Sequence, residues 1–476
     1  MDAGDAYIDL YDVLAGCPQV SLLDWYGAPA TQERAAEVCQ VVGAAGEVPD
    51  EHWRTWLPDG AACSEEAFGV LLGLDLALLD ADPYRGTPGT PLGAPRGNLQ
   101  VHGRLNEDET RGILLFRRTT PGRPSVEPES IDGFLELIRI PPHLTSKVHV
   151  KYCPVLDDLP DPDQDGDDPS GEGLPPLSVI PLAQLPMLAE PGDLIWVTPD
   201  DSHYTVAPNS AVLAQYVPQA LAELDASGAV LALLPEASLD DYLLRVWQEA
   251  LRSTVADGPL TWLLAGTGPI RGQGPAAGGE RPPNRAVLLH RSGKLLLTQD
   301  KQRGFTLTSK DQQDKYGLTY AGSKRAEYIT QGTRLSVLES CRGRFAVAVC
   351  EDLERAGIRD QVIKSGTTHL MVPVLAGGMY KDGWQPPDAY MVAVEAGTDV
   401  AVSNGLAIEP RRPTRFERCK QDFDREDGTL AGLRAYRDSI AEKIGQTIGY
   451  RQAKTQAPAA FTRRVVQLMV LVEYCL

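Results

Sequence analysis

The chain has 476 residues, a formal net charge of −20, and 43% hydrophobic and 23% charged residues. This length predicts two domains rather than one core. The lack of any apolar run approaching roughly 18 residues excludes membrane-spanning helices. The eight cysteines include no close Cys-x-x-Cys pair, so we expect neither a metal site nor a disulfide framework, and no cofactor is implied.

The first part of the chain, residues 1–155, predicts a small α+β domain of unknown function. Apolar residues recur there first at helical spacing and then in short alternating runs. Helices are expected at residues 7–17, 32–45 and 64–80, and strands at residues 99–101, 112–116, 135–140 and 147–152.

An acidic segment follows this first part. From residue 152 to residue 244 there are seventeen aspartates and glutamates and no lysine or arginine. Residues 157–172 are the densest stretch and are rich in proline and glycine, so they cannot bury a core. We interpret residues 156–190 as an acidic linker; the alternative is a docking segment for a basic partner. The negative charge disfavours direct nucleic-acid binding, with a local basic patch at residues 411–420 as the exception.

Three reactive side chains come at the ends of apolar strands. Glu236 follows the run 229–235, Lys301 follows the second strand of a hairpin expected over residues 284–301, and Cys350 ends the run 345–349. Residues 353–364 have helical spacing, which would place Cys350 at a strand-to-helix corner. The positive end of that helix would favour thiolate over thiol. Together these residues supply a base, a cation and a nucleophile.

From about residue 194 these motifs, in this order, resemble the nitrilase (carbon–nitrogen hydrolase) superfamily. The resemblance implies an α/β fold, with an α-β-β-α sandwich formed by residues 191–476. It also implies a catalytic triad of Glu236, Lys301 and Cys350, with Glu327 as a candidate second glutamate. Asn404 matches an asparagine typical of the family at the end of a later strand. The resemblance further implies a homo-oligomer, supported by the C-terminal helix and strand expected at residues 430–448 and 464–474.

The chemistry of an amide or nitrile explains why such residues are needed. The carbon is a poor electrophile, so the thiol of Cys350 would attack it and form a covalent intermediate. Glu236 would accept the thiol proton, pass it to the leaving amine and then activate water. Lys301 and the backbone N–H of Glu351 would stabilise the oxyanion. Residues 302–326 are polar and are interpreted as an inserted lid, and residues 376–380 as part of the pocket.

Two functional classes follow from the sequence. The first is a cytoplasmic thiol hydrolase of a non-peptide C–N bond, most simply an amide, with a nitrile or carbamoyl group as the other options. The alternative is a nitrilase-like scaffold or sensor in a multi-protein system such as bacterial anti-phage defence, with a protein partner bound by the N-terminal domain. A protease-like pairing of Cys350 with His290 or His369 is disfavoured, because neither histidine lies in a recognisable motif. No secretory signal is expected at residues 1–5.

Overall fold

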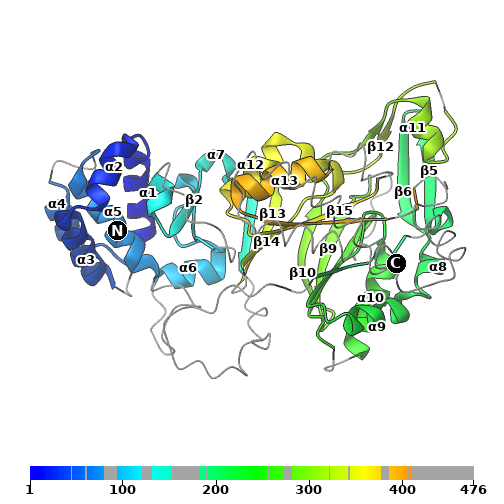
Figure 1. Ribbon diagram of the computed structural model, residues 1–476, viewed down its shortest axis with the longest axis horizontal. Helices are drawn as coiled ribbons and strands as arrows, with labels where there is room; N and C mark the ends of the chain where they lie inside the picture. Colours follow the sequence, from blue (N-terminus) through cyan, green and yellow to red (C-terminus); the bar gives the residue numbers. More distant parts are fainter. Residues whose placement is uncertain are drawn as a thin grey trace, which may run out of the picture.

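The computed structural model describes residues 1–43, 46–58, 62–79, 94–118, 131–152, 180, 182–185, 187–188, 190–254, 258–271, 281–320, 322–340, 343–376, 385–405 and 407–408. These residues form a mixed α/β structure (Figure 1). The predicted features at residues 157–172, 377–380, 411–420, 430–448 and 464–474 lie outside the described residues. Within the described part, no helix is long and apolar enough to span a membrane.

Two five-stranded sheets form the centre of the molecule. The order of the first is β10-β9-β8-β7-β4 and that of the second is β16-β15-β14-β13-β3. The strands of the first sheet are β4 (Leu182–Gln184), β7 (Leu231–Leu233), β8 (Trp262–Gly268), β9 (Arg285–His290) and β10 (Leu295–Asp300). Those of the second are β3 (Val148–Tyr152), β13 (Leu335–Ser340), β14 (Gly343–Val347), β15 (His369–Val374) and β16 (Asp399–Asn404).

The alternation of side chains along the strands produces the layers. Leu231 and Leu233 of β7 point into a core shared with the second sheet, where they join Phe345 and Val347 of β14. Ala232 between them faces the opposite side and packs under two helices. These helices are α9 (Val217–Ala226) and α10 (Asp241–Ser253), whereas α12 (Ala356–Lys364) and α13 (Gln385–Ala396) cover the other sheet (Figure 1). The expected α-β-β-α sandwich is confirmed.

A smaller four-stranded sheet extends from the sandwich at the upper right of Figure 1. Its order is β11-β12-β6-β5, and it joins two segments that lie far apart in the sequence. β12 runs parallel to β6, with Glu327 beside Tyr204. The residues interpreted as a lid therefore fold as part of this sheet. Its elements are β5 (Leu194–Asp200), β6 (His203–Pro208), β11 (Thr306–Leu307), α11 (Lys310–Lys315) and β12 (Arg325–Glu327).

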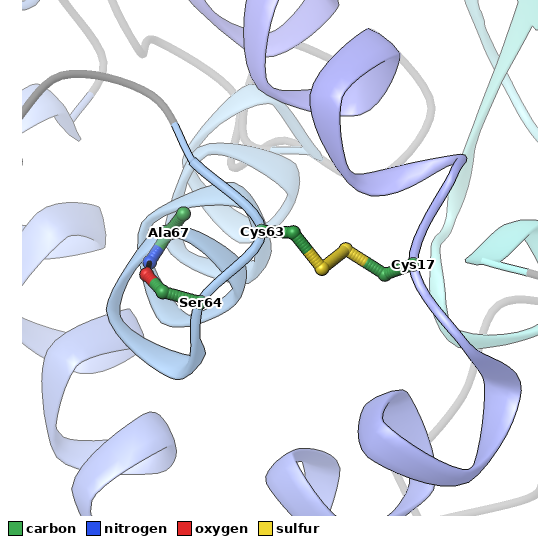
Figure 2. Close-up of a disulfide and its surroundings, with 4 residues drawn as sticks. All are labelled: Cys17, Cys63, Ser64 and Ala67. Atoms are coloured by element: carbon green, nitrogen blue, oxygen red, sulfur yellow. Dashed lines mark hydrogen bonds between the residues drawn. A yellow bond between two sulfur atoms is a disulfide. The ribbon is translucent and has the colours of Figure 1, made fainter.

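The N-terminal part is built around one buried helix, α5 (Glu65–Leu79), which is apolar on nearly every side. Ser64 caps this helix by accepting a hydrogen bond from the backbone N–H of Ala67 over 3.2 Å (Figure 2). The helices around it are α1 (Ala3–Leu14), α2 (Gln19–Tyr26), α3 (Pro29–Val42) and α4 (Asp50–Trp56). The helices predicted at residues 7–17, 32–45 and 64–80 are thus confirmed within a few residues.

The sequence analysis expected no disulfide framework, and the described residues contain one disulfide that the cysteine spacing did not indicate. Cys17, just after α1, is bonded to Cys63, just before α5, with their Cα atoms 6.0 Å apart (Figure 2). The two cysteines are separated by 46 residues, so no short sequence motif marks the pair. They meet because α1 and α5 pack together in the same apolar core.

Three expectations for the first 190 residues were wrong. Residues 99–101 belong to a helix, α6 (Ala94–His102), instead of a strand. β3 does not join a small N-terminal sheet; it pairs in parallel with β13 at the edge of the sandwich. Within the predicted linker, β4 forms an edge strand parallel to β7. Strands this short carry too little sequence pattern to specify which neighbour they pair with.

Candidate active site

Glu236 lies just beyond β7, and its carboxylate is fully engaged. Oε1 accepts hydrogen bonds from Lys301 Nζ at 2.7 Å and from Asn284 Nδ2 at 2.9 Å. Oε2 accepts one from the backbone N–H of Leu375 at 3.1 Å. The side chain is buried, so these three donors fix its position and balance its charge.

Lys301 follows β10 and is held between two carboxylates. Its Nζ donates to Glu236 Oε1 at 2.7 Å and to Glu327 Oε2 at 2.8 Å. Burial alone would lower the pKa of Lys301, but the two carboxylates outweigh it and raise the pKa well above its usual value. Lys301 is therefore a permanent cation at the bottom of the site.

Glu327 ends β12 and is linked to Glu236 through Asn284 as well as through Lys301. Asn284 Nδ2 donates to both carboxylates, at 2.9 Å in each case. Glu327 Oε2 also accepts the backbone N–H of Phe305 at 3.0 Å. Asn284 lies at the start of the predicted hairpin and had no predicted role. Its side chain bridges the two acids, a position that no spacing in the sequence signals.

Cys350 opens a short 3-10 helix, η6 (Cys350–Glu354), which precedes α12. Its φ of 52° is unusual for a residue other than glycine, and Ala237, next to Glu236, has the other positive φ outside glycine in the described chain, at 61°. Two strained turns thus flank the site. Burial raises the pKa of the Cys350 thiol well above its usual value, and Glu236 raises it further, while Lys301 lowers it. The direction of this shift is opposite to the expected preference for thiolate.

Asp352 ties the nucleophile turn to the lysine loop. Its carboxylate accepts the backbone N–H groups of Gln302 and Arg303, at 3.0 and 2.9 Å, and that of Val349 at 3.4 Å. Burial raises the pKa of Asp352 to about 7, although these N–H groups counteract the shift. The residue after Lys301 and the residue before Cys350 are therefore held by one carboxyl group.

The acid, cation and thiol open onto one cavity of about 50 Å³. Glu236, Lys301, Glu327 and Cys350 all line it. The remaining lining side chains are apolar or aromatic: Trp196, Tyr204, Val206, Phe305, Tyr316, Leu375 and Ala376. Sequence reasoning missed the aromatic members, because sheet pairing brings them together from two distant segments.

Other predicted residues take supporting positions. Asn404 ends β16 and forms two hydrogen bonds with the backbone of Ala376, at 2.9 and 2.7 Å, which fixes a lining residue. Glu351 follows Cys350 in η6, and its role as an oxyanion donor stays a prediction. No described histidine lines the cavity with Cys350; His369 instead stacks on Phe345. In the described part of the chain, no cluster of three or more His, Cys, Asp or Glu side chains could hold a metal.

No protein-family model and no curated protein matches the chain. Among solved structures, it is similar to a mutant of the amidase from Nesterenkonia sp. AN1 with the acetamide moiety of fluoroacetamide added at the active-site cysteine. That match has 16% identity and a TM-score of 0.33, and covers 48% of this chain and 79% of the amidase. The chain is also similar to Saccharomyces cerevisiae Nit3, of branch 10 of the nitrilase superfamily, at 12% identity and a TM-score of 0.32, covering 47% and 79%. At these levels, function has to be argued from the site itself.

Proposed function

We propose that the protein is a thiol-dependent hydrolase of a non-peptide C–N bond, with an uncharged amide as the substrate. Cys350 is the nucleophile, Glu236 the general base and acid, and Lys301 the oxyanion cation. Glu327 positions Lys301 and Asn284, and the backbone N–H of Glu351 is a second oxyanion donor. The observation that carries the proposal is the buried Glu236–Lys301–Glu327 chain beside a buried thiol in one cavity.

The protonation states determine the first step. Because the pKa of Cys350 is raised by burial and by Glu236, little thiolate exists at neutral pH, and the proton must leave as sulfur attacks. Glu236 accepts this proton while the Cys350 Sγ–carbonyl carbon bond forms and the carbonyl π electrons move to oxygen. Lys301 stabilises the resulting oxyanion, and loss of one such donor typically costs about 10²–10³ in rate.

The second half of the reaction returns the enzyme to its resting state. The tetrahedral intermediate collapses, the C–N bond breaks, and Glu236 gives its proton to the departing amine, leaving a thioester on Cys350. Glu236 then removes a proton from a water molecule, and the oxygen of that water attacks the carbonyl carbon of the thioester. Collapse of this second intermediate expels the sulfur, which regains the proton from Glu236, and the carboxylic acid product leaves.

Turnover and thiol labelling together test the proposal. We expect the full-length protein to release ammonia from at least one simple amide, and Cys350→Ala and Cys350→Ser to reduce kcat by at least about 10⁴. Cys39→Ala is the matched control, because Cys39 is a cysteine on α3, in the N-terminal part, and does not line the cavity; it should leave the rate unchanged. Ammonia release should be measured by a coupled assay, and labelling of each variant by intact mass.

Two results would count against the proposal. Cys350→Ser with the full wild-type rate would eliminate covalent catalysis. An absence of ammonia release from a panel of amides and nitriles, with Cys350 labelled no faster than Cys39, would favour the scaffold alternative.

A further inference from the structure

One side of the cavity is aromatic and comes entirely from the four-stranded sheet and the loops within it. Trp196 is on β5, Tyr204 on β6, Phe305 just before β11, and Tyr316 at the end of α11. We call these four residues the aromatic wall. The triad lies in the sandwich, so the cavity is formed where the two units meet.

Backbone pairing holds the aromatic wall against the acids. Glu327 is the direct neighbour of Tyr204 across the parallel β12–β6 pair, and Tyr328 N–H donates to the Tyr204 carbonyl at 2.8 Å. The Tyr204 hydroxyl donates to the Phe305 carbonyl at 3.3 Å. The Trp196 ring lies 5.8 Å from that of Tyr204 and 5.1 Å, edge to face, from that of Tyr316. The wall is thus a fixed surface.

Tyr316 differs from the other members in its polar group. Its ring packs in the wall, while its hydroxyl forms no hydrogen bond to any residue that the structure describes. Burial, followed by the charges of Cys350 and Glu236, raises the pKa of Tyr316 above its usual range. The hydroxyl therefore keeps its proton at neutral pH, and Tyr316 lines the same cavity as Cys350 and Glu236, where a phenol can serve as a donor.

Charge in the cavity disfavours an anionic substrate. Lys301 is the only cation among the described lining residues, and it is already bonded to Glu236 and Glu327. With both acids ionised, the formal charge of this group is −1. A carboxylate on the substrate would lie in an apolar space beside two carboxylates, without a free cation to pair with.

The size of the cavity limits the acyl group. At about 50 Å³ the cavity is well below the roughly 300–1,000 Å³ of a pocket for a drug-sized ligand, which favours a small acyl group. The apolar lining from Val206, Leu375 and Ala376 suits a short hydrocarbon chain.

We propose that Tyr316 positions the substrate by donating a hydrogen bond from its hydroxyl to the amide, and that the aromatic wall selects compact, uncharged amides over amides that carry a carboxylate. This inference rests on the proposed function and specifies its substrate class. The four-stranded sheet is then the specificity element of the enzyme.

Matched amides test the selection. Butyramide and succinamate differ in having a methyl group or a carboxylate at the end of the same chain. We expect wild-type kcat/KM to be at least about 100-fold higher for butyramide. Tyr316→Phe removes only the hydroxyl and should lower kcat/KM for butyramide about 3- to 10-fold, mainly through KM. Tyr320→Phe, in the same segment but exposed and outside the cavity, should match the wild type.

A labelling assay separates this inference from the proposed hydrolysis. Alkylation of Cys350 by 2-chloroacetamide and by chloroacetate, each normalised to its rate with glutathione, reports selection without turnover. We expect a strong preference for 2-chloroacetamide, reduced about 3- to 10-fold in Tyr316→Phe. If selective labelling holds but no amide is hydrolysed, the proposed function fails and the selection stands. Equal normalised rates for both reagents, or a Tyr316→Phe variant equal to wild type in both assays, would overturn the inference.

Discussion

In the proposed reaction, the neighbours of Cys350 make it reactive. Its sulfur is buried, and Glu236 raises the pKa of the thiol because a thiolate would lie near a carboxylate. The same carboxylate is thus both the reason that the thiol stays protonated and the acceptor that can remove its proton. Lys301 limits the repulsion by pairing with Glu236. Under the proposed mechanism, this arrangement couples deprotonation of the thiol to its attack on the substrate.

Replacing Glu236 separates these two effects. Glu236 raises the pKa of Cys350 because a thiolate would lie beside another anion. We therefore expect Glu236→Gln to shift the pH midpoint of Cys350 alkylation to a lower pH while turnover is lost. Glu327→Gln is the comparison for the titration, because Glu327 is not among the largest causes of the shift in the thiol pKa. The rate of alkylation by 2-chloroacetamide should be followed by mass from pH 6 to pH 11; a midpoint that stays in place or rises would contradict the argument.

Individual elements show which parts of the site a sequence can predict. The hairpin of β9 and β10 was predicted within residues 284–301, because two apolar runs flank the turn pair Ser292 and Gly293 in one short segment. β3 and β4 were assigned to the wrong units, because their partners are far away in the sequence. The aromatic wall was missed for the same reason. Asn284 was missed because an amide between two acids has no local pattern.

Gly266 shows how a neighbouring strand positions the base. It lies in β8 with a φ of 78°, and a Cβ there would collide with Ser238 Oγ and the Pro235 carbonyl, on either side of Glu236. We expect Gly266→Ala to lower the free energy of unfolding by about 2–4 kcal/mol and to reduce kcat by displacing the base. Gly192→Ala, with no atom within 4 Å of its Cβ, is the control. Chemical denaturation and amide kinetics provide the two readouts. If Gly266→Ala had the wild-type free energy of unfolding and the wild-type kcat, Gly266 would not be needed to position Glu236.

On the scale of the whole molecule, the N-terminal part and the sandwich share strands and core residues, so a linker is not their only connection. β1 (Ile113–Phe116) pairs with β2 (Leu137–Ile140). Leu114 and Phe116 of β1 point into the N-terminal core, while Ile113 and Leu115 point into the core of the sandwich. Because β3 is also an edge strand of the sandwich, a cut at the predicted boundary of residue 155 would remove part of the sheet.

A buried ion-pair network strengthens this junction. Glu339 on β13 accepts from Arg344 Nε at 2.6 Å and from Arg118 Nε at 2.7 Å. Arg344 also donates to the Phe116 carbonyl at 2.7 Å, which connects β14 to β1. Burial lowers the pKa of Arg344, and Glu339 opposes this shift. One carboxylate therefore pairs with two guanidinium groups, one from each part of the molecule.

Loss of the Glu339 carboxylate should destabilise the contact between the N-terminal part and the sandwich before it affects the reactivity of Cys350. Glu339→Ala removes the carboxylate that pairs with both Arg118 and Arg344, and loss of one partner of a buried ion pair typically costs about 3–5 kcal/mol. We expect a lower unfolding midpoint and faster proteolysis near β1, with alkylation of Cys350 retained below that midpoint. Glu109→Ala breaks an exposed pair with Arg104 and should cost less than about 1 kcal/mol. If the two variants were equally stable, the N-terminal part would not be anchored through Glu339, and the shared β1 core alone would hold it.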